Sequence, residues 1–406
     1  MLHSGPWVIL FLALRGLRQY AFSTVVAALA IALAGGLFLG TWKIKEEAKN
    51  AFSRSAGGFD AVLGARGSKL QLVLNGLFHL EASPGNLSWE QYELIRGTRG
   101  VSEAYPIAVG DNYHGFRLVG TLSEMFERHE WRAGRKYKVQ PVGRLFSDNS
   151  KEALVGAFAA RKLGLKVGDK FHPYHGLTFK EDAKHKDLYV VVGVLEPTGT
   201  PADKVIWIPI KGIQLMDGHN AETATDVSAV LLNLKGSAGF MLDMKYNKQG
   251  NVATLAWPVA GTLASFFERL VWFQRVLEII AYLVAFVAAC VILAILRNAM
   301  NERRREIAIL RSLGARRATV TGTVLAQAGL ITILGILGAF IAYAGIGSIA
   351  ASVVHEQTGV LLEPFTYDQS LFYVPLGMLV VGFLSGILPA LQAYRSDVAR
   401  NLSPTS

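Results

Sequence analysis

A 21-residue, arginine-rich segment lies between two long apolar runs of this chain. The segment, Arg297 to Arg317 (RNAMNERRREIAILRSLGARR), contains seven arginines and two glutamates, whereas the flanking runs carry no charge. An arginine at the centre of a bilayer costs about 2.5–3.5 kcal/mol on insertion scales, so this segment cannot lie in lipid. It therefore predicts a short loop between two membrane-spanning helices. Because short cytoplasmic loops are enriched in Lys and Arg, we expect this loop in the cytoplasm.

The same loop has a helical pattern. Ile307, Leu310 and Leu313 recur every three residues, and Gly314 is a residue type that commonly ends a helix. A basic amphipathic helix on the inner side of a membrane protein indicates a docking surface for a cytoplasmic partner. The alternative is an anchor that binds acidic lipid headgroups.

Four uncharged runs are long enough to cross a membrane, since about 20 helical residues span a hydrocarbon core of roughly 30 Å. The uncharged runs are 19–42, 279–296, 318–354 and 369–394, and the predicted spans are 19–42, 273–296, 318–348 and 369–394. The third run is longer than one span needs, which predicts a tilted helix that continues past the outer surface. The remaining segments are a cytoplasmic interfacial helix at 1–18, an extracytoplasmic domain at 43–272, the cytoplasmic loop at 297–317, a short extracytoplasmic loop at 349–368 and a cytoplasmic tail at 395–406.

The charges beside the spans set the orientation. Arg15 and Arg18 precede the first span and Arg395 follows the last, whereas residues 355–368 contain acidic side chains and no Lys or Arg. Both termini are therefore predicted in the cytoplasm. The formal net charge of +10 reflects this membrane topology and does not indicate nucleic-acid binding. A cleaved signal at Ala32-Leu33-Ala34 is the alternative for the N-terminus, but the preceding stretch is much longer than a usual n-region.

The segment between the first two spans combines helix and strand patterns. Ser88-Trp89-Glu90-Gln91 resembles a capping box that begins a short helix. Strands are predicted at 101–109, 116–121, 188–195, 204–210 and 227–234, with helices at 156–163 and 255–272. The sequence thus predicts an α-helical membrane protein with four transmembrane helices and a large extracytoplasmic α+β domain between helices 1 and 2.

Sequence motifs of enzymes are absent from the chain. It has no phosphate-binding loop, dinucleotide fingerprint, H-E-x-x-H or G-x-S-x-G motif. The chain is therefore not predicted to be an enzyme, and no catalytic, cofactor-binding or metal-binding residue is assigned. His172, His175 and His185 could supply imidazoles to a metal ion, but their spacing matches no specific motif. Ordinary exposed histidines are the favoured interpretation.

Small residues in the spans predict close helix packing. The pattern has two readings, packing within the chain or an interface between subunits, and the sequence leaves both open. The glycines concerned are Gly36, Gly40, Gly335, Gly338, Gly382 and Gly386.

The run Asn301–Ala315, NERRREIAILRSLGA, closely resembles the cytoplasmic loop of MacB/FtsX/LolC-type (type VII) ABC permeases, in which ERRREI-x-ILR-x-LGA precedes the third span. The N-terminal ALRGLR at 13–18 and the tail LPA-x-x-AYR at 388–395 are also similar to that family. In the predicted exported domain, Gly143-Arg144 and the run Leu163–Asp169 look like the MacB-type periplasmic core domain. The resemblance covers essentially the whole chain.

The resemblance implies that the basic loop is a coupling helix seated on a separate ATP-binding subunit, which would hold ATP and Mg²⁺. The residues of this coupling helix would be Glu302, Arg303, Arg304, Arg305, Glu306, Ile307, Leu310, Arg311, Leu313 and Gly314. It also implies two permease copies in a bacterial inner membrane, with a heterodimer left open, and a periplasmic or outer-membrane partner.

The implied function is a permease that transmits ATP-driven movements to its extracytoplasmic domain, and so exports or extracts a lipophilic, peptide or lipoprotein-like substrate. One alternative is an FtsX-like transmitter that regulates a cell-envelope enzyme without transport. A metal-linked exporter or sensor, based only on the histidines, is another.

Overall fold

The computed structural model describes residues 6–216, 225–250, 252–302, 309, 312 and 316–395. The chain divides into two compact units. The first, here called the helical unit, consists of Met1–Glu46, Val271–Ala350 and Pro364–Ser406. The second, the sheet unit, consists of Glu47–Leu270 and Ala351–Glu363. Each is considered by itself.

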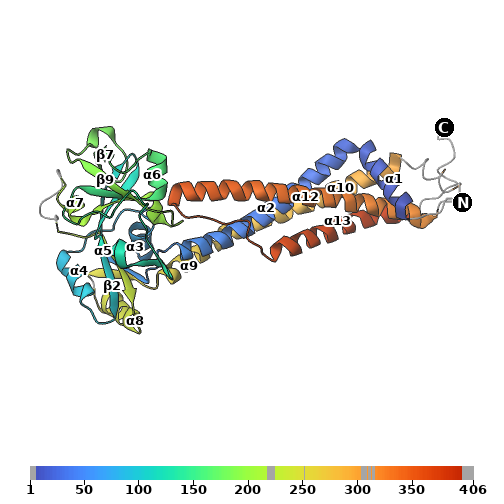
Figure 1. Ribbon diagram of the computed structural model, residues 1–406. Coiled ribbons are helices and arrows are strands. Elements are labelled where there is room, and N and C mark those ends of the chain that lie inside the picture. The colour runs from blue at the N-terminus through green and yellow to red at the C-terminus, as the bar shows by residue number, and fades with distance from the viewer. Residues whose placement is uncertain are drawn as a thin grey trace. The chain divides into compact units, whose positions relative to one another are not determined.

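The helical unit is built from long apolar helices that run alongside one another (Figure 1). Its helices are α1 (Pro6–Gln19), α2 (Ala21–Arg54), α10 (Val271–Glu302), α12 (Arg317–Thr358) and α13 (Ser370–Arg395). All except α1 are long and apolar enough to cross a membrane. The predicted four transmembrane helices are thus confirmed by length and composition.

Two of these helices extend beyond the length that a bilayer requires. Helix α2 has 34 residues and α12 has 42, and both contribute their last residues to the sheet unit. The first half of the predicted extracytoplasmic loop at 349–368 is therefore helical, because α12 continues to Thr358. The helix ends there because Gly359 has a φ of +76°, a left-handed conformation that glycine adopts without strain.

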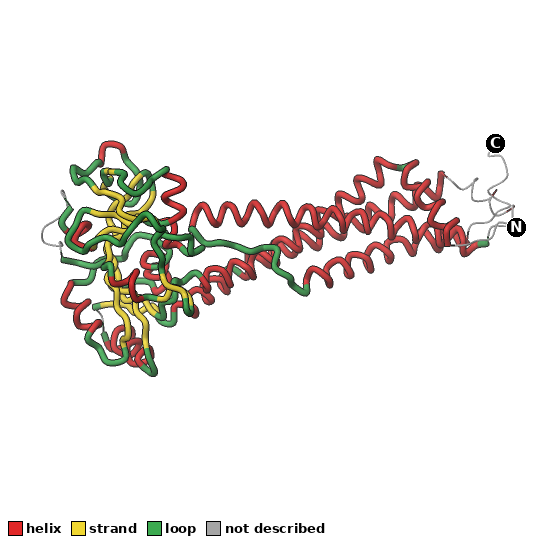
Figure 2. Tube along the Cα trace, in the orientation of Figure 1, coloured by secondary structure: helices red, strands yellow, loops and turns green. Residues whose placement is uncertain are grey.

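The sheet unit contains a mixed sheet with flanking helices (Figure 2). Along the main path the strand order is β12-β1-β11-β2-β3-β10-β6-β9-β7, with β8 pairing β2 beside it, and β4 and β5 form a separate ribbon. The β3–β10 and β6–β9 pairs are parallel and the others antiparallel. The strands are β1 (Ala61–Ala65), β2 (Val101–Tyr113), β3 (Phe116–Thr121), β4 (Glu130–Arg132), β5 (Arg135–Lys136), β6 (Glu152–Val155), β7 (Lys170–Phe171), β8 (Tyr174–His175), β9 (Tyr189–Val194), β10 (Ile206–Pro209), β11 (Ala229–Leu234) and β12 (Ala253–Ala256).

The helices of the sheet unit are short. They are α3 (Lys69–Gly76), α4 (Trp89–Arg96), α5 (Glu124–Arg128), α6 (Ala157–Leu163), α7 (Ile210–Gln214), α8 (Ala238–Asp243) and α9 (Val259–Arg269), with 3-10 turns η1 (Glu181–Ala183) and η2 (Pro201–Lys204) and a π-helix η4 (Met244–Gln249). Ser88 caps α4 by accepting a hydrogen bond from the Gln91 amide, as predicted. The predicted helix at 255–272 is wrong at its start, because Leu255 belongs to β12, which pairs with β1.

Both faces of the sheet are buried. Successive residues of one strand alternate between two hydrophobic clusters: Ile206 packs into the first and Trp207 into the second. Such a two-sided sheet needs apolar residues at every position of its central strands. The second cluster also contains residues from the ends of long helices, with Ala51 of α2 fully buried and Val354 of α12 packed against it.

A buried histidine lies at the edge of this second cluster. His79 is 9% exposed, has a φ of +54° and packs edge-on against Trp207, with ring centroids 5.4 Å apart. Among the described residues its Nδ1 has no hydrogen-bond partner. Burial, reinforced by the charge of Arg117, lowers the pKa of His79 from 6.5 to about 3.

His79→Asn is expected to reduce the acid sensitivity of the protein. As the pH falls below 6.5 the unfolded chain binds a proton at His79, whereas the folded chain does so only near 3, so wild-type stability is lost across that interval. Asparagine tolerates the left-handed backbone. Thermal melting of the full chain in detergent at pH 7 and pH 4.5 measures the difference.

The matched control for this prediction is His114→Asn, at an exposed histidine with a φ of +47°. It should keep the wild-type pH dependence. An equal loss of Tm on acidification in the wild type and His79→Asn would contradict the prediction.

Candidate functional site

The predicted coupling helix lies almost entirely outside the described residues. Of its predicted residues only Glu302 is described, as the last residue of α10, where it accepts a hydrogen bond from Asn298 Nδ2 at 2.9 Å. The others, Arg303, Arg304, Arg305, Glu306, Ile307, Leu310, Arg311, Leu313 and Gly314, stay predictions from sequence. On the far side of the loop, the Arg317 guanidinium lies over the Tyr394 ring, 5.3 Å from its centroid.

The six glycines lie at contacts between helices of one chain. A Cβ on Gly36 or Gly40 of α2 would meet Ala342 at 2.5 Å or Ile346 at 3.1 Å, both on α12. In the other direction, a Cβ on Gly335 would lie 2.5 Å from Ile31. For the other three glycines, a Cβ on Gly338 would meet Ala32, one on Gly382 would meet Thr332 and one on Gly386 would meet Ala328. At each of the six positions, therefore, glycine permits close packing between two helices of the same chain.

Gly382→Ala is expected to destabilise the helical unit. Its Cβ would lie 1.9 Å from Thr332 Oγ1, which is held in place by its hydrogen bond to Ala328 O at 2.8 Å. Overpacking of this kind costs about 1–3 kcal/mol. Gly377→Ala on the same helix is the control, because a Cβ there meets nothing within 4 Å.

Both substitutions replace a helical glycine by alanine and gain the same helix propensity. The difference between their Tm values therefore reports the effect of the packing contact at Gly382. Thermal melting in detergent should give a lower Tm for Gly382→Ala than for Gly377→Ala. Equal Tm values would show that the α12–α13 contact tolerates a methyl group.

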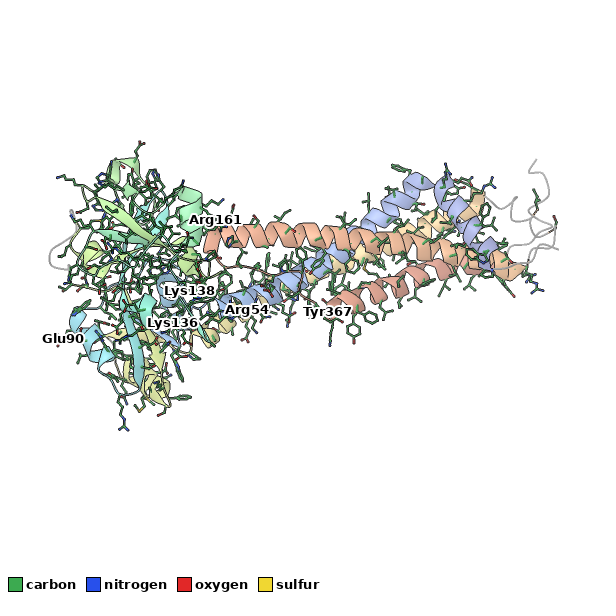
Figure 3. All side chains as sticks on the ribbon, viewed as in Figure 1. Arg54, Glu90, Lys136, Lys138, Arg161 and Tyr367 are labelled. Carbon is green, nitrogen blue, oxygen red and sulfur yellow. The ribbon has the colours of Figure 1, made fainter. Side chains whose placement is uncertain are left out.

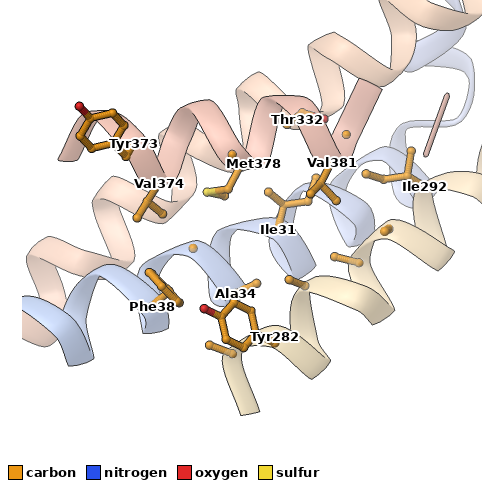
Figure 4. Close-up of a pocket in the computed structure, with 17 residues that line it drawn as sticks. Ile31, Ala34, Phe38, Tyr282, Ile292, Thr332, Tyr373, Val374, Met378 and Val381 are labelled. Carbon is orange, nitrogen blue, oxygen red and sulfur yellow. The ribbon is translucent and has the colours of Figure 1, made fainter. Parts of the chain in front are cut away.

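An apolar cavity of about 450 Å³ lies among the four long helices of the helical unit (Figure 4). No charged side chain lines it, and Thr332, Tyr282 and Tyr373 supply the polar atoms. Its volume is within the usual range of ligand pockets. Such a lining suits a hydrocarbon group rather than an ion or a polar solute.

The C-terminal end of α12 is fastened to the rest of the sheet unit by polar contacts. Lys162 Nζ lies 2.9 Å from Glu356 Oε1, and Lys204 Nζ donates a hydrogen bond to Gln357 O. Just after the helix, Leu361 N donates to Gly199 O at 3.4 Å. The segment 351–363, here called the α12 junction, is thereby attached to the loop that precedes β10.

A buried aspartate orders the loop beneath the α12 junction. Asp203 is 3% exposed, and its carboxylate accepts hydrogen bonds from the amides of Thr198 and Gly199 at 2.8–3.0 Å. Burial raises the pKa of Asp203, while the hydrogen bonds from Gly199 and Thr198 oppose that rise. These hydrogen bonds hold the loop in place, and the carbonyl oxygen of Gly199 in this loop accepts the hydrogen bond from the Leu361 amide.

The end of α2 is tied to the α12 junction through one buried carboxylate. Glu47 is 4% exposed, and its Oε1 lies 2.6 Å from Arg54 Nη2 and accepts the Glu363 amide at 3.1 Å. Figure 3 shows Arg54 near the end of α2. Sequence reasoning did not single out Glu47 or Asp203, because their partners depend on tertiary structure and neither belongs to a motif.

The structure also gathers two of the three predicted histidines. His175 and His185 meet at Asp111, a carboxylate that the sequence did not highlight. His172 is not part of this group, and its Nδ1 lies 2.9 Å from Asp187 O.

Two family models match the sequence. The MacB-like periplasmic core domain matches residues 24–239, which is more than half of the chain, and the FtsX-like permease C-terminal domain matches residues 278–398. The chain belongs to the MacB/FtsX-type ABC permeases. The resemblance is thus confirmed, and the family is the permease component of ABC transporters.

Solved structures of ABC transporter domains show low similarity to this permease. The extracellular domain of the noncanonic ABC-type transporter YknZ from Gram-positive bacteria is 19% identical, with a TM-score of 0.30, over 48% of this chain and 97% of that one. The periplasmic region of MacB from Actinobacillus actinomycetemcomitans is 10% identical, with a TM-score of 0.34, over 52% and 94%. No curated protein matches the chain.

Proposed function

We propose that this permease couples ATP hydrolysis on a separate ATPase subunit to movement of its sheet unit outside the cytoplasm. The observation that carries the proposal is the continuity of α2 and α12. Each is one unbroken helix whose apolar part belongs to the helical unit and whose last residues belong to the sheet unit. A helix with every turn hydrogen-bonded transmits displacement along its axis better than a loop does.

The ends of both helices are embedded in the sheet unit. Ala51 and Phe52 of α2 and Val354 of α12 pack into or against the second hydrophobic cluster, and Val360 just after α12 is fully buried there. Phe52 also stacks on Phe78, with ring centroids 5.1 Å apart. A displacement of either helix would therefore be passed directly to the sheet, because no flexible linker separates the helix end from the hydrophobic cluster.

The remaining parts of the proposal follow from the sequence and the family. The permease lies in a bacterial inner membrane with both termini in the cytoplasm and works as two copies with two ATPases, which hold ATP and Mg²⁺. Its substrate is lipophilic, peptide or lipoprotein-like, and the apolar cavity of the helical unit supports a lipophilic group. A periplasmic or outer-membrane protein receives the substrate.

Leu310→Asp is expected to abolish co-purification of the ATPase with the permease, because it places a charge on the apolar stripe of the predicted coupling helix. The control is Ser312→Asp in the same loop, since Ser312 is exposed and lies off that stripe. Gentle detergent extraction from the native host, followed by identification of the co-purifying proteins, is the measurement.

Retention of the ATPase by Leu310→Asp, or its equal loss from Ser312→Asp, would count against a coupling helix.

A strain that lacks the permease gene distinguishes transport from signalling. Sensitivity to drugs or mislocalised lipoproteins supports transport, and chained cells would indicate an FtsX-like regulator of a cell-envelope enzyme.

Val354→Asp is expected to break mechanical coupling without loss of ATPase binding, because Val354 packs against the second hydrophobic cluster. Val353→Asp is the control, since the neighbouring Val353 is 53% exposed. Hydrogen exchange of the permease–ATPase complex is compared with and without ATP plus vanadate.

In the wild type and Val353→Asp, ATP should change exchange in peptides covering the α12 junction. In Val354→Asp that nucleotide-dependent change should be lost while the ATPase stays bound. A nucleotide response in Val354→Asp equal to that of the wild type would contradict transmission through this helix end.

A further inference from the structure

Three side chains with metal-binding atoms meet at one edge of the sheet unit. Asp111 of β2 and His175 of β8 are direct cross-strand partners, so their side chains lie on the same face. His185 follows η1 and is held beside β8, because its amide donates to Pro173 O at 2.9 Å. A register shift in the β2–β3 pairing between Val109 and Asp111 adjoins this position. The group is thus assembled by three separate segments of backbone.

The distances within the group resemble those of a coordination site. Asp111 Oδ1 lies 3.1 Å from His185 Nε2 and 3.4 Å from His175 Nδ1, and one atom from each residue lies within 4.8 Å of the other two. Ligands about 2.0–2.2 Å from a tetrahedral cation are about 3.3 Å apart. The His175–Asp111 separation is close to this value, and the His185–Asp111 separation is about 0.2 Å shorter. The exposed His175 ring can turn to bring the two imidazoles closer.

The burial of the group favours a cation. Asp111 is fully buried and His185 is 8% exposed. A buried carboxylate is costly unless positive charge compensates it, and a divalent cation supplies that charge while leaving both imidazoles neutral. The competing explanation is that Asp111 only accepts hydrogen bonds from the two rings.

The ligand set selects the class of cation. Two imidazoles and one carboxylate suit Zn²⁺ and other late first-row metals, whereas Mg²⁺ and Ca²⁺ require mostly oxygen ligands. The His175 side chain is 60% exposed, so the site is open to solvent on one side. Three protein ligands with one open position are typical of sites that exchange a ligand, in contrast to closed structural zinc sites.

We propose that Asp111, His175 and His185 form a solvent-open binding site for a late first-row divalent cation such as Zn²⁺. This site goes beyond the proposed coupling function and does not depend on it. Because its ligands come from β2, β8 and the segment after η1, an occupied site would tie that segment to the sheet. The fourth position would accept water or a donor atom from a bound partner.

The test uses the full-length chain in detergent, purified without a polyhistidine tag and stripped with a chelator. Zn²⁺ binding is measured by equilibrium dialysis with metal analysis, and excess Mg²⁺ and Ca²⁺ are added in a parallel series. The variants are His175→Ala and Asp111→Asn. The matched control is His172→Ala, three residues from His175 and outside the group.

The wild type and His172→Ala should each bind one Zn²⁺ per chain, without displacement by Mg²⁺ or Ca²⁺. His175→Ala and Asp111→Asn should bind it at least tenfold more weakly. Absence of Zn²⁺ binding above the detergent blank, or wild-type affinity in His175→Ala, would overturn the proposal and leave the hydrogen-bonded explanation. Equal loss in His172→Ala would overturn the ligand assignment.

Folding does not obscure this result. His175 is exposed, so its replacement should leave the melting temperature of the metal-free protein unchanged. If Asp111→Asn fails to fold, the affinity of His175→Ala decides the question. Thermal melting also provides a second readout, because Zn²⁺ should raise the Tm of the wild type and not that of His175→Ala.

Discussion

The apolar residues on the second face of the sheet have to be shielded from water. The helices that shield them also determine how the long helices are attached to the sheet unit. Val62, Val119 and Leu231 are buried on that face, and exposing them to water would cost about 1.5–3 kcal/mol each. Helices α3, α5 and α9 cover part of it, and the ends of α2 and α12 cover more. The contacts that complete the hydrophobic core are therefore the ones that attach the long helices to it. Stability and the proposed transmission of movement depend on the same residues.

The membrane-spanning helices could be predicted from the sequence because the penalty for charge in lipid acts residue by residue. The end of α12 could not. Nothing in the apolar run up to Val354 opposes a helix, and the stop at Gly359 depends on a backbone conformation and on the loop that contains Gly199. The predicted helix at 255–272 begins too early for a related reason, since α9 begins only at Val259. A short apolar run such as the one at Leu255 suits a buried strand or a helix equally well, and only its pairing with β1 decides between them.

The histidines illustrate how strand register determines a site. The sequence indicates His172, His175 and His185 as possible imidazole ligands, although their spacing matches no specific motif. The antiparallel pairing of β8 with β2 instead places His175 opposite Asp111, and the bridge between Tyr174 and Lys184 brings His185 to the same place. Because a shift of one residue in this pairing would turn His175 to the other face, no reading of spacing alone could have found the group.

The glycine contacts and the helix ends concern the same two helices. Gly36 and Gly40 of α2 pack against α12, and Gly335 and Gly338 of α12 pack against α2, so these two helices approach closely along their length in the helical unit. The cavity is formed where α10 and α13 face this pair. In the sheet unit, residues at the ends of α2 and α12 pack into or against one hydrophobic cluster, and Glu47 of α2 accepts a hydrogen bond from the Glu363 amide of the α12 junction. Two helices that are packed together at one end and fastened to one cluster at the other would move as a pair. In the proposed function, an ATPase that acts on the loop before α12 would then displace both helices.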